Sequence, residues 1–372
     1  MIGKQVGVGE APLQKQTQCW RVKESKEGKS LRDHPGIQKA AAMIREGRLV
    51  AFPTETVYGL GADATSGEAV TSIFQAKGRP SDNPLIVHIA GADQLDELVS
   101  EVPSTGKQLI RRFWPGPLTV ILRHRGTVAP PVTAGLDTLG VRVPSHPVAL
   151  ALLREAQRPV AAPSANRSGK PSPTQAEHVW YDLSGRIDAL LDGGPTGVGV
   201  ESTVVDVTRE VPVLLRPGGV TLDMIRETVG EIRVDPGIRR EGRAPRSPGM
   251  KYRHYAPRGE LWVVGGSGKD QMQKVQALAD QARREGRKVG ILTTDEHREA
   301  YRAEWVFSCG RRSEPETVAR GLYGCLRRFD EVGAEWIVAE AFPPTGVFFS
   351  VMNRLMKAAE GQVLSSGEER KA

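Results

Sequence analysis

Apolar runs and amphipathic stretches alternate along most of this chain, as strands and helices alternate in α/β proteins. Ile37, Ala40 and Ile44 recur at helical spacing before Gly47, which is placed to end a helix. The apolar run 49–52 that follows is typical of a short buried strand. The same patterns predict helices at 37–46, 67–76, 92–99, 104–113, 147–156, 174–181 and 221–229. The strands predicted between them are 49–52, 85–89, 118–122, 140–143, 159–162, 201–207 and 211–215.

A second succession of strands and helices begins at Leu261. Its predicted strands are 261–264, 288–293, 303–307 and 335–340, and its predicted helices are 270–285, 315–330 and 350–359. This succession is typical of a small Rossmann-like α/β unit. Residues 265–269 are rich in glycine but lack the spacing of a phosphate-binding P-loop, so we interpret them as a strand-to-helix turn.

The chain therefore divides into four segments. We expect a polar N-terminal extension at 1–30, a first α/β domain at 31–237, a linker at 238–259 and a smaller C-terminal α/β domain at 260–372. The linker is basic and rich in proline and glycine. Its end carries two tyrosines and a histidine, and because aromatic side chains need a surface to pack on, we expect it to lie on the first domain.

Composition adds a modest preference for anionic partners. The 372 residues are 39% hydrophobic and carry a formal net charge of +7, which fits nucleotides, acidic substrates and RNA equally well. Aromatic residues make up only 5%, which gives little support to a stacking platform for single strands. Three cysteines without metal-site or disulfide spacing favour a reducing cytoplasm, and no apolar run of about 18 residues is present to span a membrane.

The turn 77–84 is the first candidate for chemistry, because it places Lys77 and Arg79 two residues apart between prolines and glycine. A fixed cationic turn suits a phosphate or a carboxylate. It is equally explained as a solvated turn, or as cations that complement the dipole of the preceding helix.

Three further loops at predicted strand ends carry hydroxyl groups or cations, namely 54–58, 164–174 and 216–219. Arg142 lies in an apolar strand and needs an anion, which is either a carboxylate such as Asp137 or a ligand. His88 follows the cationic turn closely enough to reach the same cavity. No carboxylate pair and no nucleophile with a base at motif spacing stands out, so the loops favour stabilisation of phosphate charge.

Several ordered motifs resemble the Sua5/YrdC family over residues 35 to 360. They are Phe52-Pro53-Thr54-Glu55-Thr56-Val57-Tyr58-Gly59-Leu60, Lys77-Gly78-Arg79-Pro80, Asn83-Pro84-Leu85, Trp114-Pro115-Gly116-Pro117-Leu118-Thr119, Pro163-Ser164-Ala165-Asn166, Gly199-Val200-Glu201-Ser202-Thr203, Arg216-Pro217-Gly218 and Asn353-Arg354-Leu355-Met356-Lys357-Ala358-Ala359. The layout is similar to the long, two-domain Sua5 form. The resemblance implies a YrdC-like twisted mixed sheet with helices, followed by the Rossmann-like C-terminal domain.

The resemblance also implies an activity. Members of the family are nucleotidyltransferases that form threonylcarbamoyl-adenylate and pyrophosphate from L-threonine, bicarbonate and ATP, for t6A37 biosynthesis on tRNA. Both nucleophiles then come from substrates, which agrees with the absence of a side-chain nucleophile. Mg²⁺ is expected to arrive with ATP, and no metal ligand from the protein is predicted.

Site residues follow from the resemblance position by position. It implies catalytic roles for Lys77, Arg79, Ser164 and Asn166. It implies threonine binding by Thr54, His88 and Ser202. It implies ATP binding by Arg79, Asn83, Thr133, Arg142, Ser164, Asn166, Ser172, Arg216 and Tyr255.

Partners and alternatives complete the prediction. A downstream tRNA threonylcarbamoyl transferase is the expected protein partner, in transient contact, and the basic charge leaves weak tRNA or RNA binding open. A double-stranded RNA or tRNA-binding module without catalysis is the alternative function. Carbamoyl transfer in hydrogenase maturation is disfavoured, since the larger proteins that perform it carry cysteine clusters absent here. For the C-terminal domain and linker we expect a regulatory or lid role.

Overall fold

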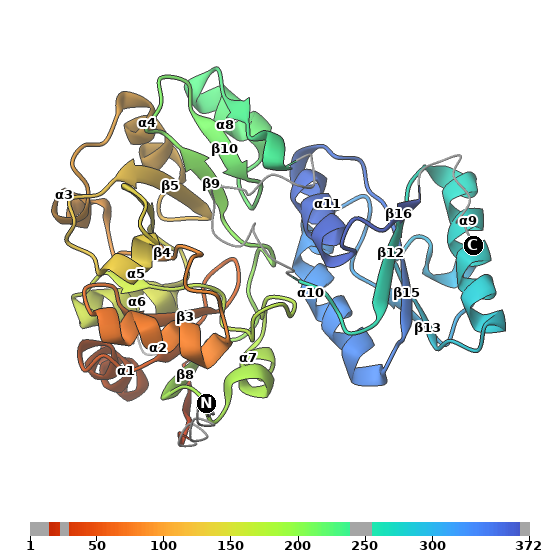
Figure 1. Cartoon of the computed structure of the whole chain (residues 1–372), viewed down its shortest axis with the longest axis horizontal. Coiled ribbons are helices and arrows are strands. Elements are labelled where there is room, and N and C mark those ends of the chain that lie inside the picture. The colour runs from red at the N-terminus through yellow and green to blue at the C-terminus, as the bar shows by residue number, and fades with distance from the viewer. Residues whose placement is uncertain (1–14, 23–29, 239–254, 365–372) are drawn as a thin grey trace, which may run out of the picture.

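The computed structural model describes residues 15–22, 30–238 and 255–364, and these form two α/β units side by side (Figure 1). The predicted linker 238–259 falls largely outside the described residues. Across the described ranges, every helix is too short or too polar to cross a membrane.

The first unit is built on a mixed sheet. Its strands are β1 (Gln18–Arg21), β2 (Val50–Phe52), β3 (Gly59–Asp63), β4 (Ile86–His88), β5 (Leu118–Arg123), β6 (Thr138–Arg142), β7 (Val160–Ala161), β8 (Ala189–Asp192), β9 (Thr203–Asp206), β10 (Val213–Arg216) and β11 (Arg233–Val234). Within the described residues their order is β1-β8-β2-β3-β7-β4-β6-β5-β9-β10-β11. Pairing is parallel at β4/β6 and β5/β9 but antiparallel at β3/β7 and β5/β6, so the predicted mixed sheet is confirmed.

Helices cover this sheet on both faces. They are α1 (Pro35–Arg45), α2 (Gly67–Lys77), α3 (Leu95–Leu98), α4 (Ser104–Phe113), α5 (Pro130–Thr133), α6 (Pro147–Ala156), α7 (Ala176–Leu183) and α8 (Leu222–Val229). Ile37 of α1 and Leu152 of α6 pack with Phe52 in one apolar cluster. Ile73 of α2 and Leu109 of α4 belong to a second and larger cluster. Burial of these apolar faces is the main force that holds the helices to the sheet.

The strands β1 and β3 were not predicted correctly. Residues 18–21, assigned to a polar extension, form β1 and pair in parallel with β8, so the extension is wrong for this segment; residues 1–14 and 23–29 lie outside the described part. β3 falls where a loop was expected, because its glycines hide the strand pattern. A Cβ on Gly61 would lie 2.8 Å from side-chain atoms of Phe52 and Val160, so neighbouring side chains fill that space.

The second unit is a parallel sheet, as predicted. Its elements are β12 (Glu260–Val264), α9 (Gly268–Arg284), β13 (Val289–Thr293), β14 (Trp305–Ser308), α10 (Pro315–Val332), β15 (Trp336–Glu340), α11 (Gly346–Ala358) and β16 (Val363–Leu364). The strand order in the described part is β14-β13-β15-β12-β16, with parallel pairing throughout. α9 covers one face, while α10 and α11 cover the other (Figure 1).

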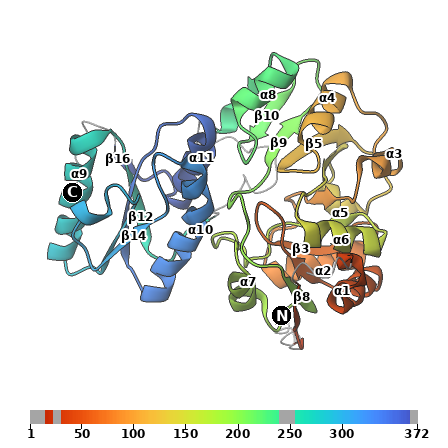
Figure 2. The ribbon, with the colours of Figure 1, turned by 180° about the vertical axis from the view of Figure 1, so that it is seen from behind.

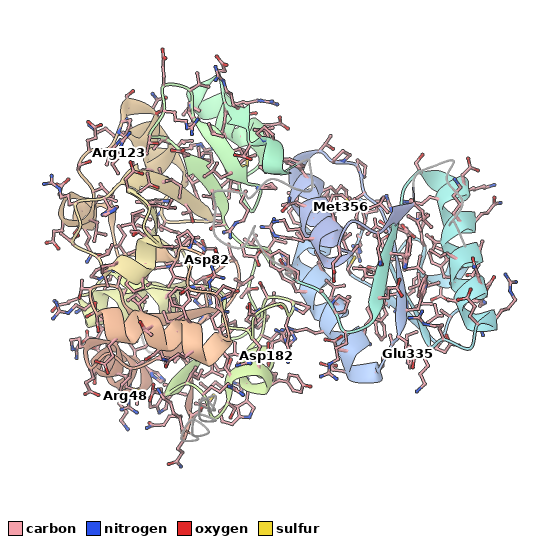
Figure 3. All side chains as sticks on the ribbon, in the orientation of Figure 1. Arg48, Asp82, Arg123, Asp182, Glu335 and Met356 are labelled. Carbon is pink, nitrogen blue, oxygen red and sulfur yellow. The ribbon has the colours of Figure 1, made fainter. Side chains whose placement is uncertain are left out.

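α10 and α11 are also the face that the second unit turns toward the first (Figures 1 and 2). Val57 and Val200 of the first unit join Leu322 and Tyr323 of α10 in one buried apolar cluster. Asp182 lies on the facing side of the first unit (Figure 3) and pairs with Arg327 of α10 at 2.7 Å. The two units therefore share apolar core and buried charge across their contact.

Candidate active site

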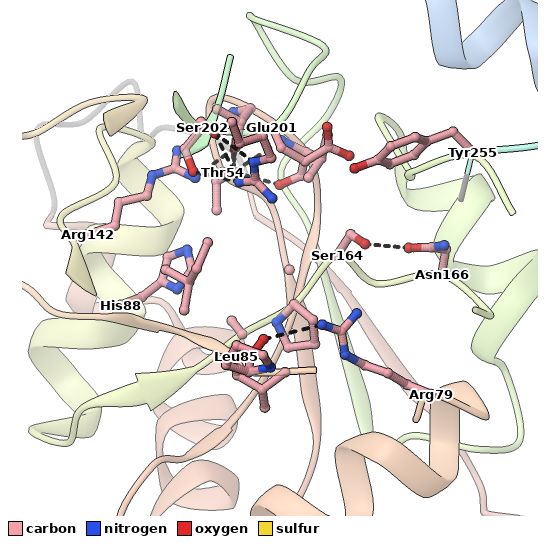
Figure 4. A pocket seen from close by; sticks show the side chains of 18 residues that line it. Thr54, Arg79, Leu85, His88, Arg142, Ser164, Asn166, Glu201, Ser202 and Tyr255 are labelled. Carbon is pink, nitrogen blue, oxygen red and sulfur yellow. Dashed lines mark hydrogen bonds between the residues drawn. The ribbon is translucent and has the colours of Figure 1, made fainter. Parts of the chain in front are cut away.

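A pocket with a mixed polar and apolar lining opens in the first unit, close to the second (Figure 4). The four loops named from the sequence all contribute to its wall, which they share with β4 and β6. The lining residues are Thr54, Thr56, Val57, Gly59, Arg79, Pro84, Leu85, Ile86, His88, Arg142, Ala162, Pro163, Ser164, Asn166, Glu201, Ser202, Arg216 and Tyr255.

The loop after β2 supplies hydroxyl groups. Thr54 Oγ1 lies 2.8 Å from Thr56 Oγ1 and donates to the carbonyl of Val57 at 2.6 Å, which holds this turn in a single conformation. Arg142 of β6 donates to Thr56 Oγ1 at 2.9 Å. The loop and the strand thus place two hydroxyls beside a buried guanidinium.

The anion that Arg142 requires is Glu55. The two side chains form a buried ion pair at 2.6 Å. Asp137, the protein partner suggested by the sequence, is exposed and pairs with Arg123 at 2.9 Å. The predicted carboxylate partner is therefore confirmed, but the example Asp137 is wrong, since the carboxylate that meets Arg142 is distant in sequence and close only in the fold.

His88 lies beside Arg142 at the pocket wall (Figure 4), at the end of β4. The side chain is 4% exposed and its ring meets Phe52 edge to face. Burial, and then the positive charge of Arg142, lower the pKa of His88 to about 3. The imidazole is thus neutral at ordinary pH and presents a dipole to a ligand.

Lys77 does not line the cavity. It is the last residue of α2, is 2% exposed, and its Nζ donates to the carbonyls of Ser164 at 2.5 Å and Asn166 at 2.6 Å. Burial, and then the neighbouring Arg79, lower the pKa of Lys77 well below its usual range. The amine is directed at backbone oxygens of the loop that carries Ser164 and Asn166, so a direct catalytic role for Lys77 stays a prediction.

Arg79 does reach the pocket. It follows Gly78, whose left-handed conformation (φ 62°) ends α2 and turns the chain toward the cavity. One of its terminal nitrogens lies 3.3 Å from the carbonyls of Asn83 and Pro84, which steadies the guanidinium. Arg79 and Arg142 thus face the cavity from different sides (Figure 4).

Ser164 and Asn166 lie together on the loop that Lys77 holds. Ser164 Oγ donates to Asn166 Oδ1 at 2.6 Å, and Asn166 Nδ2 donates to the carbonyls of Arg167 at 2.8 Å and Lys170 at 2.9 Å. These hydrogen bonds within the loop fix its conformation. Its ordered hydroxyl and amide groups offer the cavity fixed hydrogen-bonding positions.

Ser202 and Arg216 form another part of the wall. Arg216 Nη2 donates to the carbonyl of Ser202 at 3.0 Å and to its Oγ at 3.1 Å. Thr119 lies 2.8 Å from the same Oγ. Arg216 is 5% exposed and lines the cavity, so its charge adds to the cationic character of the site.

Tyr255 comes from the end of the predicted linker and lines the cavity with a side chain that is 4% exposed. Its ring lies 5.3 Å from that of Tyr323 on α10. The next residue, Ala256, donates its N–H to the carbonyl of Gly169 at 3.0 Å. This part of the linker packs on the first domain as expected, whereas residues 250–254 lie outside the described part.

Four predicted site residues are close to the cavity without lining it: Lys77, Asn83, Thr133 and Ser172. Asn83 offers its carbonyl to Arg79, and Thr133 Oγ1 donates to the carbonyl of Pro130 at 3.3 Å. Ser172 Oγ donates to Glu201 at 2.5 Å. Direct ATP contacts for the last three are therefore untested expectations, and their visible contacts are within the protein.

Two acidic residues were overlooked. Glu55 neutralises Arg142, and Glu201 lines the cavity and accepts hydrogen bonds from Ser172, Tyr323 and Arg354. Glu55 lies between two threonines of a loop already singled out, and Glu201 lies in the motif 199–203, so both were visible in the sequence. The site therefore holds more carboxylates than its loops suggested, and each of the two is paired with an arginine.

Among residues 15–22, 30–238 and 255–364, no group of three or more His, Cys, Asp or Glu side chains is arranged to hold a metal ion. The three cysteines are free, Cys19 at the surface and Cys309 and Cys325 buried. The chemistry that the described groups offer is hydrogen bonding and charge stabilisation.

The fold and the cavity define a two-domain α/β protein with a cationic, hydroxyl-rich site for a small polar ligand. Comparison with known proteins makes the assignment specific: the chain belongs to the Sua5 family. One family model of this group, described as telomere recombination, matches residues 42–218. A second, described as threonylcarbamoyl-AMP synthase, C-terminal domain, matches residues 220–360.

Relatives match over nearly their whole length. The chain is 55% identical to a protein of Bacillus subtilis named threonylcarbamoyl-AMP synthase, over 89% of this chain and 94% of that one. It is 49% identical to a Pyrococcus abyssi protein of the same name, over 88% and 95%. A crystal structure of P. abyssi Sua5 complexed with L-threonine superposes with a TM-score of 0.87 at 47% identity, covering 94% of this chain and 99% of that one.

Proposed function

We propose that this protein is a threonylcarbamoyl-AMP synthase, an enzyme that joins L-threonine, bicarbonate and ATP into threonylcarbamoyl-adenylate and pyrophosphate. One observation carries the proposal within the structure. Arg79, Arg142 and Arg216 converge on a single cavity with Thr54, His88 and Ser202. Relatives with this name match over almost their full length, and one is described in complex with L-threonine.

Threonine is assigned to the side of the cavity formed by Thr54, His88 and Ser202. The hydroxyl groups and the neutral imidazole can bind the polar substituents of an amino acid without adding a charge. Arg142 lies next to Thr56 and His88, where it donates to Thr56 Oγ1 and pairs with Glu55, so it fixes the hydroxyl groups on this side of the cavity. Because His88 is neutral, it places no positive charge next to the threonine amine.

The triphosphate is assigned to the guanidinium groups of Arg79 and Arg216 and to the donors of the Ser164–Asn166 loop. Fixed donors in a site with little water stabilise charge on phosphate oxygens more strongly than they would in solution. Mg²⁺ enters as part of the ATP substrate, since Glu201, the one carboxylate that the described residues place in the cavity wall, already accepts hydrogen bonds from Ser172, Tyr323 and Arg354.

The reaction then needs orientation and charge stabilisation. The threonine amine attacks bicarbonate, water leaves, and the resulting carbamate oxygen attacks the α-phosphorus of ATP as the bond to pyrophosphate breaks. Each new bond is made by a substrate atom. The protein holds three reactants in line, which can lower the barrier by several kcal/mol, about 7–11 at the upper limit.

The direct test uses the purified full-length chain. We expect pyrophosphate release that requires ATP, threonine and bicarbonate together, and transfer of label from bicarbonate into an adenylate. Arg79→Lys should abolish most turnover, whereas Arg123→Lys, on an exposed arginine paired with Asp137, should not. Absence of threonine-dependent pyrophosphate release would contradict the proposal, and salt-dependent RNA binding without nucleotide binding would favour the RNA-binding alternative.

The wider setting is part of the same proposal. The product is a reactive mixed anhydride, so a transferase that delivers it to tRNA for t6A37 must act soon after release. Free cysteines fit a cytoplasmic location. Co-expression with the transferase should raise t6A in a strain that lacks its own synthase, and failure to do so would count against this setting.

A further inference from the structure

Glu201 is a carboxylate of the cavity wall that is held from the other domain. Tyr323 of α10 lies with its hydroxyl 3.0 Å from both carboxylate oxygens, and Arg354 of α11 donates through Nε at 2.7 Å. Ser172 is the contact from Glu201's own domain, at 2.5 Å. Two of these three partners thus belong to the C-terminal domain.

Arg354 also contacts a second segment of the cavity wall, next to Arg216. Its side chain is fully buried, and Nη2 donates to the carbonyl of Pro217 at 2.9 Å. Pro217 follows Arg216, and Ser202 follows Glu201, so one guanidinium is bonded next to two residues that line the cavity. Arg216 in turn donates to Ser202, which joins these two segments directly.

The backbone of α10 also approaches the first domain too closely for a loose contact. A Cβ on Gly199 would lie 2.3 Å from Cα of Arg320, and Arg320 Nε donates to the carbonyl of Gly197 at 2.8 Å. Farther along the helix, Arg327 pairs with Asp182 at 2.7 Å and donates to the carbonyl of Pro171. α10 therefore contacts the loops before Glu201 and after Asn166.

The charges at this contact are matched. Although burial opposes ionisation, Arg354 and then Arg216 lower the pKa of Glu201 to about 2. Burial, and then Glu201, raise the pKa of Tyr323, which keeps its hydroxyl protonated as a donor. Loss of either partner would leave a buried carboxylate with fewer hydrogen bonds, which is costly in a dry environment.

We propose that Tyr323 and Arg354 are positioning residues of the active site: from the C-terminal domain they fix Glu201, and through it Ser202 and Arg216, in the geometry that binds the substrates. The inference rests on the proposed function and goes beyond it, because it makes the C-terminal domain part of the site. The domain is then more than a lid, since its side chains hold a residue of the cavity wall in place.

Tyr323→Phe is the sharpest variant, because it removes one hydroxyl and keeps the ring. Tyr301→Phe is a matched control: Tyr301 is also buried and donates to a buried carboxylate, Glu340 at 2.7 Å, but within the C-terminal domain and outside the cavity. We expect kcat/KM for pyrophosphate release to fall about tenfold or more in Tyr323→Phe and to stay near wild type in Tyr301→Phe.

A double-mutant cycle tests whether Tyr323 acts through Glu201. In the background of Glu201→Gln, Tyr323→Phe should cost much less than in the wild type, because the carboxylate it serves is gone. Equal losses in the two phenylalanine variants, or additive losses in the cycle, would overturn the inference while leaving the proposed function intact.

The proposed function fails separately, if the wild type releases no threonine-dependent pyrophosphate. The same proteins would then be compared by ATP binding in titration calorimetry. A selective and non-additive loss of affinity in Tyr323→Phe supports the positioning role, and equal or additive losses overturn it.

Discussion

Lys77 carries a buried amine whose hydrogen bonds are used inside the fold. Its amine serves the carbonyls of Ser164 and Asn166, so Lys77→Met should leave both acceptors short of a donor and lower the free energy of unfolding by about 3 kcal/mol. Activity should fall as well, because the loop with Ser164 and Asn166 loses its support. Denaturant unfolding and steady-state kinetics check this; unchanged stability with a raised KM for ATP alone would mean that Lys77 contacts the nucleotide.

His88 makes a prediction about pH. Its folded pKa of about 3 lies below the ordinary value of 6.5, so the folded state disfavours the protonated ring. The associated stability is complete above pH 6.5 and is lost as pH falls toward 3. Nitrogen NMR of the imidazole should show a neutral ring at about pH 5, where an unperturbed histidine is mostly charged. A ring that titrates near its ordinary pKa would show that this site is wetter than described.

Sequence reasoning at the residue scale found most of the cavity wall but not its internal pairing. Arg79, Arg142, Ser202 and Arg216 were placed correctly, since motif residues at strand ends converge in α/β folds. The partners Glu55 and Glu201 were missed, because an ion pair such as Arg142–Glu55 joins residues that only the folded sheet brings together.

At the scale of elements, the tight crossing of α10 over Gly199 gives a prediction with a built-in control. Gly199 (φ 83°) would place a Cβ against the backbone of Arg320, whereas Gly126 (φ 81°) has open space around it. Alanine at either position carries the strain of a left-handed residue, of order 1 kcal/mol. Gly199→Ala should cost clearly more stability and also activity, because it forces α10 away from the cavity wall.

The measurements are denaturant unfolding and kcat/KM for both alanine variants. Equal effects of Gly199→Ala and Gly126→Ala would show that α10 does not pack closely against the loop in solution.

The helices were predicted well, since their apolar periodicity is strong; α6 covers the predicted residues 147–156. Short strands such as β3 and β8 were not predicted, because glycine residues and runs of three to five residues leave too little hydrophobic pattern to recognise.

At the scale of the whole molecule, the sequence predicted two α/β units with a boundary near residue 238, but it could not show how far they share a core. Val57 and Val200 pack into the apolar cluster of α10 and α11, and Glu201 and Asp182 pair with arginines from those helices. Such contacts carry no local signal, because their partners are more than a hundred residues apart in the chain. These contacts join the two units through a common apolar core and buried ion pairs.

A shared core predicts shared unfolding. We expect one calorimetric transition for the full-length protein, with calorimetric and van't Hoff enthalpies that agree, although two-domain proteins commonly unfold in steps. Arg327→Met leaves Asp182 with fewer partners at the interface and should separate the transitions, because breaking a buried ion pair costs about 3–5 kcal/mol. Arg312→Met is the control, since Arg312 pairs with Glu340 inside the C-terminal domain and should lower stability without separating the transitions. Two resolved transitions in the wild type would mean that the domains are only docked, and the active site would then have to work without support from α10 and α11.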